Sequence, residues 1–262
     1  MLRKDIVRPL PGGHRHADVQ EIAKFDELAE EWWRPDGKFK VVHAFNAARV
    51  DYLIDFFAQQ SNACTGANSN LPLSGLRLLD AGCGAGIVSL PLAESGAKVT
   101  GIDASAQSIA VAQRQAEHLE LRVDFRCATP AEIREAEAAF DCGICLEVVE
   151  HVGDLEAFID DLSHLISPGG QLVLGTINRT VQSYLKAIIG AEYILNWLPK
   201  RTHDWSKFVK PAELKELLEA RGYREIARQG LTFDPLRWQW RLGTDTSVNY
   251  LIAFEKQPSM VS

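Results

Sequence analysis

Apolar residues follow two different spacings along most of this chain. From residue 75 onward, short apolar runs alternate with stretches in which apolar residues recur every three or four positions. The runs are typical of buried strands, and the second spacing is typical of helices with one buried face. This alternation predicts an α/β fold with a doubly wound, mostly parallel sheet of seven strands, the last pair antiparallel. The predicted strands are 76–80, 98–102, 121–127, 140–146, 171–177, 223–230 and 247–255, and the predicted helices are 86–95, 105–118, 129–137, 154–166 and 211–220.

The region before the sheet carries a helical pattern instead. Two amphipathic stretches, 21–33 and 46–59, predict a helical cap over residues 19–60. A run rich in Asn, Ser, Gly and Pro at 61–74 predicts a surface loop that joins this cap to a sheet domain at 75–256. Residues 1–18 and 257–262 are predicted to be loose tails.

The alternation stops at 178–210, which we expect to form an apolar insert after the fifth strand. Its centre, 183–198, is apolar almost all round, and basic residues such as Lys186 and Lys200 lie in or after it. At ~1.5 Å per residue, the segment is too short to cross a ~30 Å hydrocarbon core. It suits a helix that lies in the membrane interface or covers an apolar substrate. The alternative is a core helix buried at a dimer contact.

Composition narrows the classes of partner. The 262 residues carry a net charge of −7, which argues against nucleic acid because phosphate binding needs a basic face. No apolar run reaches the ~20 residues of a membrane span, and no secretory signal is apparent, so the expected location is the cytoplasm. Cys142 and Cys145 spell C-x-x-C, but residues three apart on a strand point to opposite faces. We therefore expect buried free thiols rather than a zinc or redox site.

A glycine-rich turn follows the first predicted strand. Asp80 closes that strand, and Gly82, Gly84 and Gly86 follow at alternate positions. A dinucleotide-binding fold would have its third glycine where Ile87 stands. The G-x-G-x-G pattern suits a ligand without phosphate whose amino-acid part lies over the turn, such as S-adenosylmethionine. The alternative is a turn with a structural role only.

The second predicted strand ends at another acid, Asp103, 23 residues after Asp80. A carboxylate at about this spacing, at the tip of the second strand, accepts hydrogen bonds from both ribose hydroxyls. The alternative is that Asp103 caps the helix that follows. Ser105 is an equally good cap, which would leave Asp103 for the ribose.

Three polar side chains follow the fourth predicted strand. On a helical turn, Glu147 would meet Glu150 at i+3 and His151 at i+4. Two carboxylates and an imidazole suit Mg²⁺ or another divalent cation, and Glu147 or His151 would otherwise serve as a general base. The alternative is electrostatic, because acids in the first helical turn are favoured by the helix dipole.

With these residues in view, the chain resembles the class I S-adenosylmethionine-dependent methyltransferases, which have a Rossmann-like fold. More closely, it is similar to the ubiquinone biosynthesis O-methyltransferase family from about residue 21 to residue 254. The most specific matching segments are Glu31-Trp32-Trp33, 37–40, 176–180, 190–193, 202–205 and 248–250. Departures are small: Ala47 stands where the family commonly has Pro, and Ala85 where it often has Gly.

The resemblance implies cofactor contacts at Arg49, Gly82, Asp103 and Leu146. Arg49 would reach from the helical cap to the methionine carboxylate; the alternative is a surface ion pair with Asp51 or Asp55. The implied reaction is methylation of a phenolic hydroxyl on a polyprenylated catechol or demethylubiquinol. The implied setting is the inner face of the cell membrane, reached through 183–198, with assembly into a ubiquinone biosynthesis complex. A small-molecule O-methyltransferase acting on another, water-soluble phenol or acid is the alternative.

Overall fold

The computed structural model describes residues 32–33, 40–60, 71–135, 139–180, 183, 207–234, 237 and 239–258. The predictions for the tail at 1–18, for the helix at 21–33 beyond Trp32 and Trp33, and for most of the loop at 61–74 lie outside these residues. The same holds for the interfacial segment 183–198 beyond Ser183. None of the helices in the described ranges combines the length and apolarity needed to cross a bilayer.

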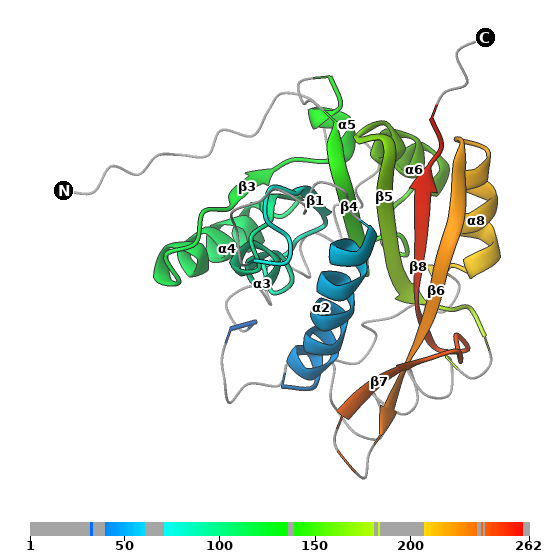
Figure 1. Cartoon of the computed structure of the whole chain (residues 1–262), viewed down its shortest axis with the longest axis horizontal. Helices are drawn as coiled ribbons and strands as arrows, with labels where there is room; N and C mark the ends of the chain where they lie inside the picture. The colour runs from blue at the N-terminus through cyan, green and yellow to red at the C-terminus, as the bar shows by residue number, and fades with distance from the viewer. Residues whose placement is uncertain are drawn as a thin grey trace.

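One sheet organises the described residues, in the order β3-β2-β1-β4-β5-β8-β6-β7 (Figure 1). The first five strands in this order run parallel, and β8 pairs antiparallel with both β5 and β6. The doubly wound, mostly parallel sheet is therefore confirmed. The strands are β1 (Arg77–Ala81), β2 (Lys98–Asp103), β3 (Asp124–Cys127), β4 (Phe140–Leu146), β5 (Ile166–Ile177), β6 (Tyr223–Asp234), β7 (Gln239–Gly243) and β8 (Asn249–Lys256).

The strand count differs from the prediction by one, because β7 was not expected. β7 is a short edge strand that pairs only with β6, and most of its residues are exposed or half-buried. Its sequence, Gln239-Trp240-Arg241-Leu242, does alternate polar and apolar residues, so this short strand carried the period-2 signal and was overlooked.

Two further boundaries differ for local reasons. β5 begins at Ile166 rather than at 171, because the predicted turn around Gly169 is accommodated inside the strand as a shift of register against β4. The predicted strand 121–127 pairs only from Asp124, because Leu121 instead closes the preceding helix through a 2.9 Å bond from its N–H to the Ala116 carbonyl.

Helices cover both faces of the sheet, and alternate strand residues contribute to two separate cores. Leu78 and Cys142 pack toward α2 and α3, whereas Leu79 and Cys145 face α6 and α8. Both thiols are buried and free, as predicted for the C-x-x-C segment. In Figure 1, α2 lies in front of the strands and α6 behind them. The helices are α2 (Lys40–Gln60), α3 (Ser89–Glu94), α4 (Ala106–His118), α5 (Pro130–Ile133), α6 (Leu155–His164) and α8 (Pro211–Glu219).

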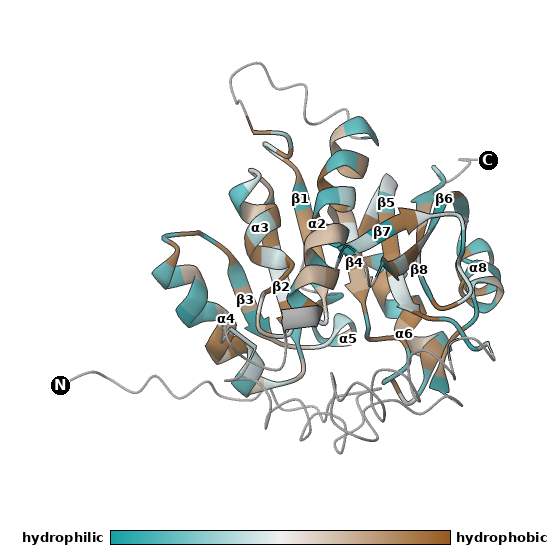
Figure 2. Cartoon of the chain, turned by 90° about the horizontal axis from the view of Figure 1, so that it is seen from below, coloured by the Kyte–Doolittle hydropathy of each residue, from teal (hydrophilic) through white to brown (hydrophobic). Residues whose placement is uncertain are grey.

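Helix α4 packs beside α3 through a smaller apolar cluster that contains Leu90, Ile109 and Phe125. The outer turns of α4 and α8 carry mostly hydrophilic residues (Figure 2). This distribution is the amphipathic pattern from which the helices were predicted.

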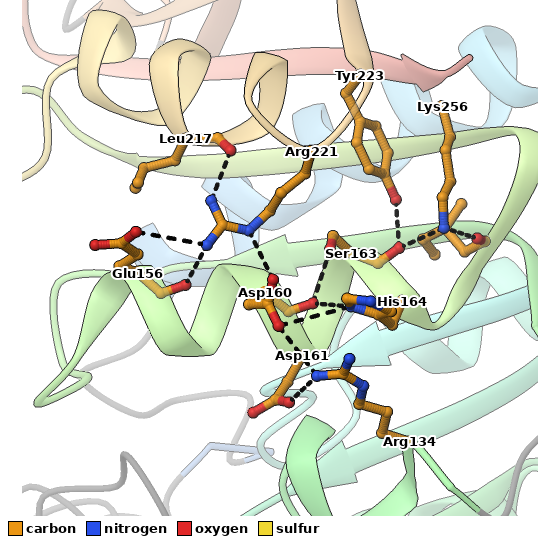
Figure 3. Close-up of polar contacts among 11 residues, drawn as sticks. Arg134, Glu156, Asp160, Asp161, Ser163, His164, Leu217, Arg221, Tyr223 and Lys256 are labelled. Carbon is orange, nitrogen blue, oxygen red and sulfur yellow. Dashed lines mark hydrogen bonds and ion pairs between the residues drawn. The ribbon is translucent and has the colours of Figure 1, made fainter. Parts of the chain in front are cut away.

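A polar cluster, which we call the α6 network, ties α6 to its neighbours (Figure 3). Arg134 bonds Asp160 and Asp161, and Arg221, which follows α8, bonds Asp160 at 3.1 Å and the Leu217 carbonyl at 2.8 Å. Partial burial alone would raise the pKa of Asp160, but hydrogen bonds from Arg134 and Arg221 lower it below its ordinary value.

The end of α6 is completed by two side chains from other elements. The Tyr223 hydroxyl and the Lys256 ammonium both donate to the Ser163 carbonyl, at 2.8 and 2.9 Å, and Lys256 also donates to the Ile166 carbonyl. Carbonyls at a helix C-terminus have no partner within the helix, so these contacts satisfy them.

Candidate functional site

The predicted site residues gather at the carboxyl ends of the parallel strands. Asp80 lies near the end of β1, Asp103 ends β2 and Leu146 ends β4. The strand order reverses between β1 and β4, which is the topological switch point where open α/β sheets bind ligands. The sequence therefore places its candidate residues at the edge where the fold favours a site.

The glycine turn leaves one position open. Gly82 and Gly84 have φ values of +80° and +52°, which L side chains rarely adopt. A Cβ at Gly82 would overlap the Val148 side chain, so packing alone demands glycine there. A Cβ at Gly84 would meet no described atom within 4 Å. The backbone at Gly84 is thus open to close approach by a ligand.

Asp103 faces this open turn. Its carboxylate accepts the Gly84 N–H at 2.9 Å and the Ser105 N–H at 2.8 Å. Ser105 is the residue that caps α4, through its bond from the Ser108 N–H. The cap role considered for Asp103 is therefore filled by Ser105, and a half-buried carboxylate lies beside Gly84.

Asp80 lies beneath the turn and is 3% exposed. It accepts a 2.5 Å hydrogen bond from the Ser89 hydroxyl at the start of α3. Burial raises the pKa of Asp80 to about 7; the Ser89 bond opposes this shift and the charge of Asp103 adds to it. In this arrangement Asp80 joins the end of β1 to α3.

Arg49 crosses from α2 to the end of β4, where it forms an ion pair with Glu147. The side chain is 2% exposed, and its partner is neither Asp51 nor Asp55, so the surface ion pair considered from the sequence is wrong. The guanidinium lies 3.6 Å from the centre of the Phe45 ring. Its Nε is buried and has no hydrogen-bond partner among the described residues.

The segment after β4 is a turn rather than a helix. Glu147 has φ +56°, and its N–H donates to the Gly175 carbonyl at 2.7 Å. The predicted convergence of Glu147, Glu150 and His151 on a helical turn is therefore wrong. Within the described ranges, no three His, Cys, Asp or Glu side chains are grouped to hold a metal ion.

Glu150 is buried in this turn and is 3% exposed. Neither of its carboxyl oxygens has a hydrogen-bond partner in the described part of the chain. Burial, together with the negative charge of Glu147, raises the pKa of Glu150 to about 8. The Thr176 hydroxyl and the charge of Arg49 oppose this shift.

Aromatic residues complete the site in ways that the sequence analysis did not assign. The Trp33 Nε1–H donates to the Ala85 carbonyl in the glycine turn at 2.8 Å. Trp240 of β7 packs against Phe45 with ring centres 4.5 Å apart and ring planes tilted by 49°. The contact of Trp33 with Ala85 could have been suspected, because Trp32 and Trp33 belong to a segment that matches the family. The contact of Trp240 with Phe45 could not, because no residue next to Trp240 in the sequence points to it.

Known proteins match most of the length of this chain. The Methyltransferase domain family matches residues 48–227. A protein named ubiquinone biosynthesis O-methyltransferase from Cereibacter sphaeroides (strain ATCC 17029) is 44% identical over 237 residues, which cover 90% of this chain and 95% of the relative. The protein of the same name from Methylocella silvestris is 40% identical over 248 residues, which cover 94% and 97%.

A solved structure shares the fold. Magnesium protoporphyrin IX methyltransferase from Synechocystis PCC 6803, with bound SAH, superposes with a TM-score of 0.62. The match covers 90% of this chain and 94% of that one at 21% sequence identity.

Proposed function

Because the chain belongs to the family of ubiquinone biosynthesis O-methyltransferases, we propose that it transfers a methyl group from S-adenosylmethionine to a phenolic oxygen of a polyprenylated catechol or demethylubiquinol. The observation that carries the proposal is the pairing of the open turn at Gly84 with the Asp103 carboxylate. An acceptor of ribose hydroxyls thus lies beside backbone that a ligand can approach closely.

The residues at this edge fit the parts of that cofactor. Asp103 would accept the ribose hydroxyls, and Gly82 and Gly84 would line the amino-acid part. Arg49 would bind the methionine carboxylate, for which its buried Nε supplies an unused donor. Leu146, half-buried at the end of β4, would pack against the ligand between these groups.

Transfer of the methyl group needs the acceptor oxygen as a phenolate in line with the methyl carbon. S-adenosylmethionine supplies an activated methyl group when bound. A phenol with a pKa near ~10 is mostly protonated at neutral pH, so a base must take its proton. Glu147 or His151, in the turn beside Leu146, would take this proton. The buried surroundings of Arg49 and Glu150 would keep water away and hold the reactants in line.

Use of a divalent cation held by Glu147, Glu150 and His151 stays a prediction. These side chains do not form a ligand set in the described structure, so no step is derived through a metal. Assays with and without a chelator decide the point: full activity in chelator would exclude the metal.

Contact with the membrane through 183–198 is also part of the proposal, because a polyprenylated acceptor stays in lipid. Wild-type protein and a variant with Ile188, Ile189 and Leu195 changed to Asp would be sedimented with liposomes. We expect the variant to lose binding, and equal binding would rule the role out.

The reaction itself is tested by incubating the protein with labelled S-adenosylmethionine and a prenylated catechol. We expect label in the prenylated product and a loss of transfer in an Asp103→Asn variant. Faster transfer to a water-soluble catechol than to the prenylated one would support the alternative acceptor class. Absence of cofactor binding would overturn the proposed function.

A further inference from the structure

The ion pair between Arg49 and Glu147 lies next to the glycine turn. Glu147 precedes Val148, whose side chain fills the space beside Gly82. Arg49 reaches the same point from α2, 98 residues earlier in the chain. The pair therefore links the residue proposed to bind the methionine carboxylate to a residue proposed to act on the phenolic acceptor.

The arginine side of this pair is held firmly. The side chain is 2% exposed, its guanidinium lies over the Phe45 ring, and that ring contacts Trp240 of the β6–β7 hairpin at a tilt of 49°. Asn46 accepts a hydrogen bond from the other terminal nitrogen at 3.4 Å. In Figure 1, the start of β7 lies beside α2, the helix that carries Phe45 and Arg49. Aromatic faces on a cation fix its plane, so Arg49 is oriented by groups other than Glu147.

The glutamate side is held less firmly. Glu147 is 30% exposed, and its backbone adopts the left-handed conformation that costs of order 1 kcal/mol or more for a residue with a Cβ. Its side chain reaches solvent, whereas that of Arg49 does not. Of the two partners, Glu147 is the one that can leave without exposing apolar surface.

We propose that the Arg49–Glu147 ion pair is an exchangeable contact: Arg49 gives up Glu147 as it takes the methionine carboxylate, and Glu147 is thereby released to the phenolic acceptor. This inference rests on the proposed function and concerns the same site. Two carboxylates competing for one buried guanidinium repel each other, and a single positive charge neutralises only one of them. Cofactor binding would therefore precede productive binding of the acceptor.

The exchange predicts that removing the charge of Glu147 strengthens cofactor binding. An ion pair that only held Arg49 in place would predict weaker binding. In a Glu147→Gln variant, the neutral amide holds Arg49 less strongly, so S-adenosylhomocysteine should bind about three- to tenfold more tightly than to wild type. If Glu147 instead held Arg49 in place for the cofactor, the same variant would bind more weakly. Isothermal titration calorimetry on the full chain measures this difference without turnover.

Two further variants make the result specific. In an Arg49→Gln background, the gain from Glu147→Gln should disappear, because the coupling runs through the guanidinium. Glu255→Gln breaks an exposed Arg–Glu pair, with Arg224 at 2.9 Å, and should leave affinity unchanged. Thermal unfolding of each variant with and without ligand checks folding, and the ligand-induced shift in Tm should be largest for Glu147→Gln.

Unchanged or weaker binding by a folded Glu147→Gln variant would overturn the exchange. So would a gain that persists without Arg49, because it would then reflect the loss of a nearby negative charge alone. Either result leaves the proposed function standing as long as wild type binds S-adenosylhomocysteine. Absence of binding by wild type would instead refute the proposed function itself.

Discussion

Two groups of charged residues in the described structure differ in their burial and in how completely they are hydrogen-bonded. In the middle of α2 and in the turn after β4, Arg49 and Glu150 are buried and retain polar atoms without hydrogen-bond partners in the described residues. In the α6 network, Asp160 and Arg221 are partly exposed and each makes several hydrogen bonds. A buried polar group without a partner destabilises the fold, whereas a satisfied one at the surface contributes modestly. The contrast indicates that the first group is kept for ligands and the second for the fold.

The largest expected effect comes from Asp103 at the ligand-binding end. Changing Asp103 to Asn should weaken cofactor binding about 100-fold or more, because a charged acceptor of two ribose hydroxyls is lost. The free energy of unfolding should fall by only about 1 kcal/mol, because the single amide oxygen can accept one of the two N–H groups, of Gly84 and Ser105, that the carboxylate accepts. Calorimetric titration with S-adenosylhomocysteine, alongside thermal unfolding, measures both quantities. A large loss of stability with unchanged affinity would show that Asp103 serves the fold and not the cofactor.

Two glycines of the same turn are expected to have different roles, Gly82 in packing and Gly84 in ligand contact. Gly82→Ala should lower the free energy of unfolding by about 3 kcal/mol, because the new Cβ overlaps Val148 at a positive φ. Gly84→Ala should cost only about 1 kcal/mol, since its Cβ meets open space, but it should weaken cofactor binding. Denaturant titrations compare the two variants. Equal losses of stability would show that Gly84 is structural as well.

A substitution of Arg221 tests whether the α6 network serves the fold rather than ligand binding. Arg221→Ala should lower the free energy of unfolding by about 1–2 kcal/mol, because it removes bonds to Asp160 and to the Leu217 carbonyl. Cofactor affinity should stay at the wild-type value. An Arg224→Ala variant, at a side chain that is 66% exposed, is the matched control and should unfold like wild type. A drop in cofactor affinity for Arg221→Ala would show that the α6 network also affects the ligand-binding site.

The smallest effect is a pH dependence in the α6 network. The pKa of Asp160 is lowered in the folded state, so its contribution is present above the unfolded pKa of about 3.9 and is lost as pH falls through the folded value. Asp160→Asn should cost about 0.5 kcal/mol near pH 6, a figure that allows for solvent screening at a 40%-exposed side chain. The difference from wild type should shrink as the pH falls below the unfolded pKa of about 3.9. A constant difference across this range would assign the effect to packing.

The fold and the family could be predicted because their signals are local. The apolar spacings gave the doubly wound sheet, and the glycine turn with Asp103 indicated a methyltransferase; the sheet is observed, and the family matches. Ser105 as the cap of α4 and the separated thiols of Cys142 and Cys145 also follow from rules that need only neighbouring residues.

The remaining features depend on contacts between distant parts of the chain. The partner of Arg49 lies 98 residues away, so no periodicity points to it. The helical turn expected at Glu147 fails because its backbone adopts φ +56° and bonds the Gly175 carbonyl of β5. Trp240 packs against Phe45 only because the β6–β7 hairpin returns to α2. Such contacts are set by tertiary packing, which overrides local preference.

The place of β8 has a consequence for synthesis on the ribosome. Residues 249–256 emerge after every other strand of the described sheet, yet they lie between β5 and β6. Until they emerge, β6 and β7 have no strand through which to join the parallel strands, and β5 has an unpaired edge. Cotranslational folding of the sheet therefore stays incomplete until these eight residues appear, and a nascent chain stalled before them would be a substrate for chaperones.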